Sequence, residues 1–600
     1  MSIFVAKSFA KTLTNFLING IIYMSIIFWR ILMKEKFKSW AFSKEHGKCD
    51  VITLIIYLLG VCTVSFFHEP WFDEAQAWAI ARSGTIKEIL FEIPHYEGHP
   101  PLWHLILVPF AKLGAPYELS LAAVNIFFMT LAVTVLLFKS PFPKLIRCLL
   151  PFNFFLFYQY GVISRPYCIL VLAIFLAAVC YKNRNEHPVK YLLCLALMCA
   201  VHSYGIMIAG GLCIVWLIEI FIEYKKSGKL ASIFKDRRCW LMFCLLIFAL
   251  LILVSVVPNN DVYVGGKTTN KGNFTFNIGL VNVVFCFLLF SDSFLTSFFN
   301  YSGVSSDITS CITMALVAVP LLLIFLSFMH KNKKLLLFLL TYAVTAIFGA
   351  YVYMSPHHIG IFCTWTIAVL WIIFDENGRI EIPQYIIKVY DSINPKLQVA
   401  FKLIAFLPLL IPVAWSGVSS YFDIRYAYWC TEAADFIKEY NLDDYKIMGC
   451  WQCVPSGNAE TPKNGFGYVD EEDIDWLDFP NLQGLSVAID PYFEKNIFYN
   501  FNIDTPNMTY QNHKTNTQKE AEEEFAKWRE QGEPDVVIER CEITKAYPDI
   551  DVDNYVAVKR IYFYKPYKFE TYDQYITIYV TKDLFNKIGT LEELTAKKLY

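Results

Sequence analysis

Long apolar runs separated by short polar loops fill most of the chain between residues 51 and 420. A helix that crosses a bilayer needs about 20 mostly apolar residues, with a range of about 17–25. The pattern therefore predicts a polytopic α-helical membrane domain of about 11 spans. These spans are expected at 51–68, 118–138, 145–161, 166–181, 189–203, 205–223, 238–257, 308–329, 334–354, 357–374 and 400–420.

The pattern changes after residue 420, where Asp, Glu, Lys, Asn and Tyr become frequent and long apolar runs end. Helical spacing from Thr431 to Tyr440 and a charged stretch from Glu520 to Gln531 predict two helices. Short apolar runs between and after them are typical of strands. Residues 421–600 are therefore expected to form an α/β domain, with strands at Tyr445–Gly449, Leu485–Ile489, Asp535–Ile538, Tyr555–Val558 and Tyr575–Val580.

The basic residues predict the orientation of the membrane domain, because short cytoplasmic loops are enriched in Lys and Arg. If residues 34–50 lie inside, the inner loops between predicted spans carry eighteen Lys and Arg residues. The short outer loops then carry three: Arg165, Lys267 and Lys271. We therefore expect a multi-pass plasma or inner membrane protein with its N-terminal side cytoplasmic and the domain 421–600 extracytoplasmic.

Two further apolar runs do not fit this alternation as spans. Pro101 to Leu113 has thirteen residues, too few to cross, and is expected to lie flat on the outer surface within a first outer loop 68–117. The run 280–299 is interrupted by Ser291-Asp292-Ser293 and is expected to be re-entrant or interfacial. Counting either run as a span would place the later basic loops outside.

Residues 1–50 are expected to form a cytoplasmic or interfacial segment. Within it, the stretch 13–33 is mostly apolar but contains Arg30 and is flanked by lysines. It has no cleavage site of the signal-peptide type. An extra span and an interfacial helix both remain open for it.

Composition supports a membrane protein and gives little sign of other classes. The chain is 56% hydrophobic and 18% charged, with a net charge of -2, so nothing suggests a nucleic-acid partner. Most of the seventeen cysteines lie in apolar runs, where Cys acts as a small hydrophobe. Cys450 and Cys453 form a lone CxxC, read as a disulfide or structural pair more readily than as a redox or metal site.

The first outer loop contains a candidate catalytic pair, Asp73 and Glu74, in the stretch Trp71-Phe72-Asp73-Glu74-Ala75. Asp73 precedes a helical pattern, so it also suits a simple N-cap, in which a carboxylate accepts a backbone N–H. Glu74 likewise suits the first turn, where the helix dipole stabilises negative charge. Both the capping and the catalytic interpretation stay open at this point.

Other polar clusters fall on the same predicted outer side. Ionisable groups at membrane depth are costly and usually have a partner or a function. Arg is a preferred partner of phosphate, and His titrates near neutral pH. Together they have the makeup of a site for a phosphate-bearing substrate; the residues are Glu97 and His99, Arg165 and Tyr167, His202 and Tyr204, and His357 and His358.

In this order, the landmarks resemble those of the GT-C superfamily of glycosyltransferases. They are Phe72-Asp73-Glu74-Ala75, His99-Pro100-Pro101-Leu102, Ser164-Arg165-Pro166-Tyr167, His202-Ser203-Tyr204-Gly205 and His357-His358-Ile359-Gly360. The resemblance covers roughly residues 51–420 and is nearest to protein O-mannosyltransferases and the lipid A aminoarabinose transferase. The chain departs from the family pattern at three places. The family often has a basic residue where this chain has His99, an Arg in the stretch Ala122-Ala123-Val124-Asn125, and an Arg at the position of His357.

The resemblance implies an enzyme that moves a hexosyl or pentosyl group from a polyprenyl-phosphate sugar to a glycan, lipid or protein hydroxyl outside the cytoplasm, with inversion. It makes Asp73 the general base, with Glu74 beside it, and assigns donor phosphate binding to Arg165, His357 and His358. Glu97, His99, Tyr167, His202 and Tyr204 would complete the substrate pocket. The lipid-linked sugar is a substrate, so no cofactor is implied. The first loop contains no Asp-x-Asp motif, so no metal is expected.

Other classes also fit outer-facing charges. One is a transporter or flippase of lipid-linked saccharides, although no internal repeat is evident. Another is a polysaccharide polymerase or ligase that uses a lipid-diphosphate donor. A third is a receptor whose tail binds a ligand.

Overall fold

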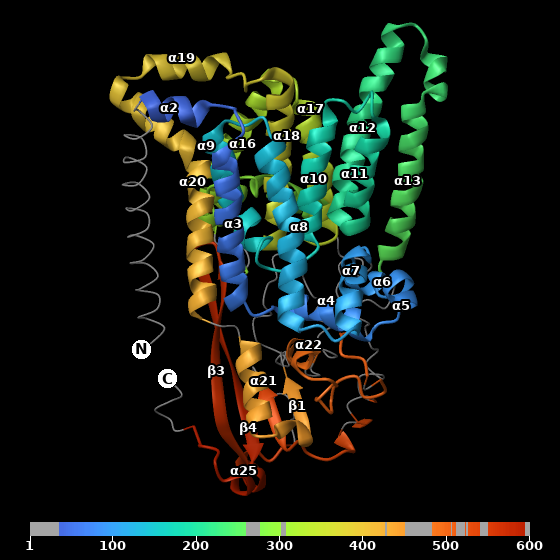
Figure 1. Ribbon diagram of the computed structural model, residues 1–600, viewed down its shortest axis with the longest axis vertical. Helices are drawn as coiled ribbons and strands as arrows, with labels where there is room; N and C mark the ends of the chain where they lie inside the picture. The colour runs from blue at the N-terminus through green and yellow to red at the C-terminus, as the bar shows by residue number, and fades with distance from the viewer. Residues whose placement is uncertain are drawn as a thin grey trace.

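A bundle of apolar helices stands on a small sheet domain in the computed structural model (Figure 1). The structure describes residues 35–259, 276–301, 308–426, 429–450, 483–505, 507–511, 523, 526–527, 529–539 and 550–594. The possible helix at 13–33, Cys453 and most of the predicted helix 520–531 lie outside these residues.

Seven helices within the described residues are long and apolar enough to cross a membrane. Each corresponds to a predicted span, and together they indicate a multi-pass membrane protein. They are α3 (Lys48–Phe67), α8 (Tyr117–Lys139), α12 (Ser203–Lys226), α13 (Arg237–Val256), α16 (Ile308–Lys331), α18 (Ile359–Asn377) and α20 (Pro395–Arg425).

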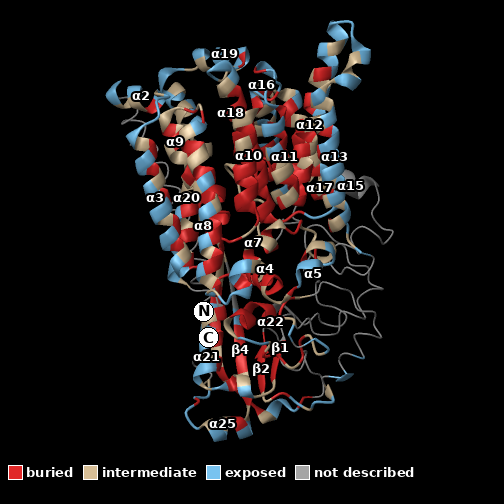
Figure 2. Ribbon diagram, turned by 45° about the vertical axis from the view of Figure 1, so that its right-hand side comes forward, coloured by how far each residue is buried: buried red, intermediate tan, exposed pale blue. Residues whose placement is uncertain are grey.

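Shorter apolar helices complete the bundle. Three of them correspond to predicted spans: α10 (Tyr167–Tyr181), α11 (Pro188–Val201) and α17 (Leu335–Tyr351). The fourth, α15 (Phe276–Leu288), ends just before a 3-10 turn at Ser291–Ser293, where the sequence predicted an interruption. Helices α10 and α18 are almost entirely buried, whereas α3 and α13 expose apolar side chains on the outside of the bundle (Figure 2).

The run 145–161, predicted as a spanning helix, is not one continuous helix. The run forms α9 (Lys144–Leu149), a 3-10 turn at Leu150–Phe152 and a π-helical turn at Phe155–Gln159. Pro151 lacks the backbone N–H that a helix interior needs. Two residues later, the Asn153 side chain accepts the backbone N–H of Phe155, a local hydrogen bond that competes with regular helix. This irregular backbone is buried between helices, where non-helical segments at membrane depth are tolerated.

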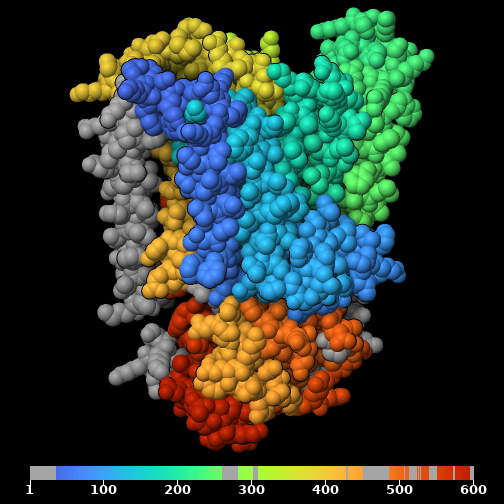
Figure 3. Space-filling model, in the orientation of Figure 1, coloured from blue at the N-terminus to red at the C-terminus, as the bar shows by residue number. Residues whose placement is uncertain are grey.

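Four helices of the segment 68–117 lie between the bundle and the sheet domain (Figures 1 and 3). They are α4 (Phe72–Ser83), α5 (Ile86–Phe91), α6 (Pro94–Glu97) and α7 (Leu102–Lys112). Helix α7 forms eleven of the thirteen residues of the run that was too short to span, and it packs against α4. Two helices at the opposite end of the bundle, α2 (Glu35–Phe42) and α19 (Gln384–Ser392), lie far from the sheet.

The C-terminal domain holds a mixed four-stranded sheet in the order β1-β2-β4-β3. Strands β1 and β2 are parallel, the other pairs are antiparallel, and a single parallel bridge joins Ile447 to Phe498. The elements are α21 (Trp429–Glu439), β1 (Ile447–Cys450), α22 (Gln483–Ile489), β2 (Val536–Glu539), β3 (Tyr555–Tyr567), β4 (Glu570–Thr581) and α25 (Lys582–Ile588).

Four of the five predicted strands are confirmed, but the strand predicted at Leu485–Ile489 is the helix α22. Every side chain from Leu485 to Ile489 is buried, so the stretch has neither the two-residue nor the 3.6-residue alternation of a half-buried element. A short, fully buried run cannot be assigned to strand or helix from periodicity alone.

The turn between β3 and β4 inserts into the helix bundle. Lys568 at its tip has no exposed surface, and its ammonium group donates to the backbone oxygens of Asp292 at 2.7 Å and Thr296 at 2.8 Å. The same ammonium lies 4.4 Å from the centre of the Trp415 ring of α20. One continuous hydrophobic core therefore runs from the bundle into the sheet.

Candidate functional site

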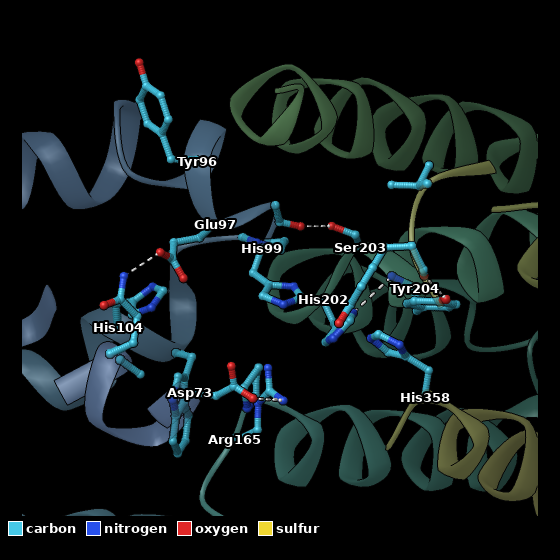
Figure 4. Close-up of a pocket in the computed structure, with 18 of the residues that line it drawn as sticks. Asp73, Tyr96, Glu97, His99, His104, Arg165, His202, Ser203, Tyr204 and His358 are labelled. Carbon is cyan, nitrogen blue, oxygen red and sulfur yellow. Dashed lines mark hydrogen bonds and ion pairs between the residues drawn. The ribbon is translucent and has the colours of Figure 1, made fainter. Parts of the chain in front are cut away.

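A cavity of about 270 Å³ opens at the end of the bundle that faces the C-terminal domain (Figure 4). Segments far apart in sequence form its walls: α4, α6 and α7, the turn before α10, the start of α12, and the end of α17 with the turn that follows it. The cavity brings together eight of the ten sequence-predicted site residues. They are Asp73, Glu97, His99, Arg165, His202, Tyr204, His357 and His358.

Asp73 and Arg165 form an ion pair in the wall of this cavity. Asp73 lies in the first turn of α4, and Arg165 lies directly before Pro166, the N-cap of α10. Arg165 Nη1 donates to Asp73 Oδ2 at 2.9 Å, and the two side chains are 14% and 39% exposed. Burial disfavours the charged form of Arg165, but attraction to Asp73, together with three nearby tyrosine hydroxyls, holds the pKa of Arg165 above its ordinary value.

Glu74 is placed differently, beneath the cavity and fully buried. Its carboxylate accepts the backbone N–H of Ser164 at 2.6 Å and that of Trp71 at 2.8 Å, and it lies 3.1 Å from His68 Nε2. The bond to Trp71 is the capping contact that the first turn of α4 needs. Glu74 therefore joins α4 to the segment that carries Arg165, without lining the cavity.

Histidine and tyrosine rings form a second wall. The rings of His99 and His202 lie 4.6 Å apart between centroids, and those of Tyr204 and His358 stack at 4.7 Å. Burial, and then repulsion by Arg165, lower the pKa of His99 to about 3, so this ring is neutral at physiological pH. Tyr167 does not line the cavity but supports this wall, with its ring 4.8 Å from that of His202.

The turn that carries His357 and His358 is held from several sides. His358 Nδ1 accepts the backbone N–H of Ser355 at 2.9 Å, so in the neutral ring the proton lies on Nε2. The Tyr160 hydroxyl donates to the backbone oxygen of His357 at 2.7 Å. Gly360 packs directly against this tyrosine, and a Cβ at that position would overlap it.

Gln76, Trp103 and His104 also line the cavity, and the sequence had not singled them out. Gln76 lies three residues after Asp73 on the same helix, a spacing that places both on one face and offered a signal. Its side chain makes two 2.8 Å hydrogen bonds with the backbone of Gln511. Nothing in the sequence indicated this contact between α4 and the C-terminal domain.

No group of three or more His, Cys, Asp and Glu residues in the described part of the chain is arranged to hold a metal ion. The cavity wall presents the Asp73 carboxylate and the Arg165 guanidinium beside the neutral ring of His99. Such a site can accept a proton and hold an anion in one place.

Comparison with known protein families, with curated proteins and with solved structures found no match to this chain.

Proposed function

We propose that this chain is a membrane glycosyltransferase of the GT-C type, with about 11 spans. It transfers a sugar from a polyprenyl-phosphate donor to an acceptor hydroxyl outside the cytoplasm and inverts the anomeric centre. The observation that carries the proposal is the Asp73–Arg165 ion pair in the wall of a cavity at one end of an apolar helix bundle.

In the proposed reaction, the Asp73 carboxylate accepts the proton of the acceptor hydroxyl. The hydroxyl oxygen attacks C1 of the sugar from the face opposite the phosphate, and the bond between C1 and the phosphate oxygen breaks. The departing phosphate needs a preplaced positive charge, which the Arg165 guanidinium supplies. A base within hydrogen-bond reach typically contributes about 10²–10⁴-fold to the rate.

The charges in the cavity favour a monophosphate donor over a diphosphate. Arg165 is the sole Lys or Arg among the described residues that line the cavity, and Asp73 already neutralises part of its charge. The pKa of His99, about 3, leaves that ring without charge. A sugar phosphodiester carries a single negative charge, which one guanidinium can balance, whereas a diphosphate would bring additional charge with no matching cation.

The position of the cavity suits a donor with a lipid chain and an acceptor in water. Exposed apolar side chains, among them Val254 of α13 and Ile347 of α17, surround the bundle near the end that bears the cavity. The basic loops 225–238 and 331–334 belong to the opposite end, which the positive-inside rule makes cytoplasmic. The proposed orientation therefore puts the cavity and the C-terminal domain outside.

The test is transfer by the purified protein in detergent, without any gradient, from radiolabelled polyprenyl-phosphate sugars. The wild-type protein should release the sugar from its lipid, and Asp73→Asn should lose about 10²–10⁴-fold of this activity while remaining folded. Asp391→Asn, which changes an exposed carboxyl on α19, is the matched control and should have no effect.

Two results would contradict the proposal. One is wild-type activity in Asp73→Asn. The other is gradient-dependent movement of a lipid-linked saccharide without cleavage of the sugar–phosphate bond, which would support the transporter alternative.

A further inference from the structure

The cavity has two polar ends of different charge. At one end the Asp73 carboxylate is paired with the Arg165 guanidinium. At the other, Glu97 of α6 and His104 of α7 face the space beyond Asp73, on the side away from His358 (Figure 4). An anionic donor phosphate is attracted to the end with Arg165 and repelled by Glu97, so the second end is left for the acceptor.

Glu97 is held in place by Gln76, which is only 3% exposed. Gln76 Nε2 donates to Glu97 Oε1 and to the backbone oxygen of Gln511, both at 2.8 Å. The backbone N–H of Gln511 donates back to Gln76 Oε1 at 2.8 Å. The amide therefore has its hydrogens and its oxygen engaged, and its orientation fixes the carboxylate of Glu97 relative to the cavity.

His104 and Trp103 bring buried polar atoms that lack a partner to the same end. His104 is 5% exposed and Trp103 2% exposed, and neither His104 Nδ1 nor Trp103 Nε1 makes a hydrogen bond with any residue that the structure describes. Burial lowers the pKa of His104 to about 4, so its ring is neutral at physiological pH. Buried polar atoms without partners are rare and costly, and at a cavity wall they point to a ligand.

We propose that Glu97, His104 and Trp103 form the acceptor subsite, and that the acceptor is an uncharged saccharide bound through neighbouring hydroxyl groups. This inference rests on the proposed function and names the acceptor class that the same cavity takes. The Glu97 carboxylate accepts hydrogen bonds from sugar hydroxyls, the neutral His104 ring donates and accepts, and the Trp103 ring offers an apolar face to the sugar ring.

A peptide acceptor fits these residues less well. A Ser or Thr side chain presents one hydroxyl, and Asp73 takes its proton in the proposed reaction. No second hydroxyl would then reach Glu97 or His104, and Trp103 Nε1 and His104 Nδ1 would stay without partners among the described residues. A sugar carries several hydroxyls around one ring, so one can meet Asp73 while others meet Glu97 and His104.

The experiment is saturation-transfer NMR on the full-length protein in detergent with a panel of methyl hexosides, alongside an uncharged serine-containing peptide. At least one methyl glycoside should bind, and Glu97→Gln should weaken its binding about tenfold or more, because a hydrogen bond to a charged group is lost. Glu92→Gln changes an exposed carboxyl on the neighbouring turn and should leave binding unchanged. His104→Phe keeps the ring volume and should weaken binding in the same way.

The enzymatic readout separates this inference from the proposed function. With a glycoside acceptor present, Glu97→Gln should raise the acceptor KM about tenfold or more, whereas Glu92→Gln should leave the acceptor KM at the wild-type value. Absence of donor cleavage in the wild type would end the proposed function but not saccharide binding. Two results would overturn the acceptor subsite. One is glycoside binding that neither Glu97→Gln nor His104→Phe weakens, and the other is binding of the peptide in preference to every glycoside.

Discussion

The Tyr567 hydroxyl donates a hydrogen bond of 3.1 Å to the backbone oxygen of Pro356, 211 residues earlier in the chain. Tyr567 ends strand β3 of the C-terminal domain, and Pro356 begins the turn that carries His357 and His358. The C-terminal domain therefore contacts the cavity wall directly. A domain that only covered the bundle from outside would have no reason to reach this turn.

Tyr567→Phe should lower the proposed transfer activity while leaving the protein folded. The substitution removes one hydrogen bond, worth about 0.5–1.5 kcal/mol, that fixes the turn, so a fall of up to about tenfold is expected. Tyr562→Phe makes the same change on the same strand, where the side chain is 48% exposed, and should be silent. Equal activity of the two variants would show that the contact does not position the turn.

Arg165→Lys should reduce kcat/KM for the proposed lipid-linked donor about 10–100-fold. Lysine keeps the charge but cannot reach Asp73 and a phosphate oxygen at once with a planar fork of donors. Arg425→Lys, at the exposed end of α20, is the control for the same exchange. Steady-state kinetics against donor concentration measure the effect, and an unchanged kcat/KM would remove Arg165 from donor binding.

Glu74→Ala should destabilise the protein, because the substitution leaves two backbone N–H groups without a buried partner and leaves His68 with Asp423 as its remaining carboxylate partner among the described residues. The expected loss is about 3–5 kcal/mol, typical of breaking a buried charged network. Glu88→Ala removes the corresponding carboxylate from the exposed capping box of α5 and should cost about 1 kcal/mol. Thermal unfolding followed by tryptophan fluorescence compares the two, and equal melting temperatures would contradict this role.

Glu69 should make stability depend on pH. Burial raises its pKa to about 7, although the hydrogen bonds from Thr431 oppose the shift. The groups that face it are Thr431, Glu118, His68 and Cys430. Because the folded state holds this proton more tightly than the unfolded state, the contribution of Glu69 to stability falls as pH rises from about 4.5 to about 7.

Glu69→Gln should therefore melt at the wild-type temperature near pH 4.5 and above it at pH 7.5, because Gln keeps an acceptor for Thr431 without a buried charge. Glu439→Gln on α21 alters an exposed carboxyl and should track the wild type at every pH. A difference between Glu69→Gln and wild type that does not change with pH would refute the assignment.

Hydrophobic periodicity and length predicted the long helices well, because a run of about 20 apolar residues has few other stable arrangements in a membrane. They failed at 145–161, where Pro151 and Asn153 break a run that is apolar enough to span. They failed again at Leu485–Ile489, where burial on all sides erases periodicity. Local pattern carries no information on which neighbours surround an element.

The sequence also predicted part of the candidate site and missed the part that depends on tertiary contacts. Residue chemistry and the shared predicted side singled out Asp73 and Arg165, which the structure joins at 2.9 Å. The sequence could not assign different roles to Asp73 and Glu74. The two roles depend on the directions in which the side chains leave the first turn of α4, and both residues suit that turn equally well. The contacts of Gln76 with Gln511 depend on how the C-terminal domain docks, 435 residues along the chain, and no local signal records that.

The burial of Lys568 has a consequence for biogenesis. This lysine leaves the ribosome after every helix of the bundle has been made, yet its ammonium group completes the hydrogen bonding of the Asp292–Thr296 turn between them. Insertion of the helices alone therefore leaves the Asp292–Thr296 turn incomplete until the hairpin of β3 and β4 docks against it. Premature stop codons before residue 568 should deliver inserted helices that quality-control proteases remove.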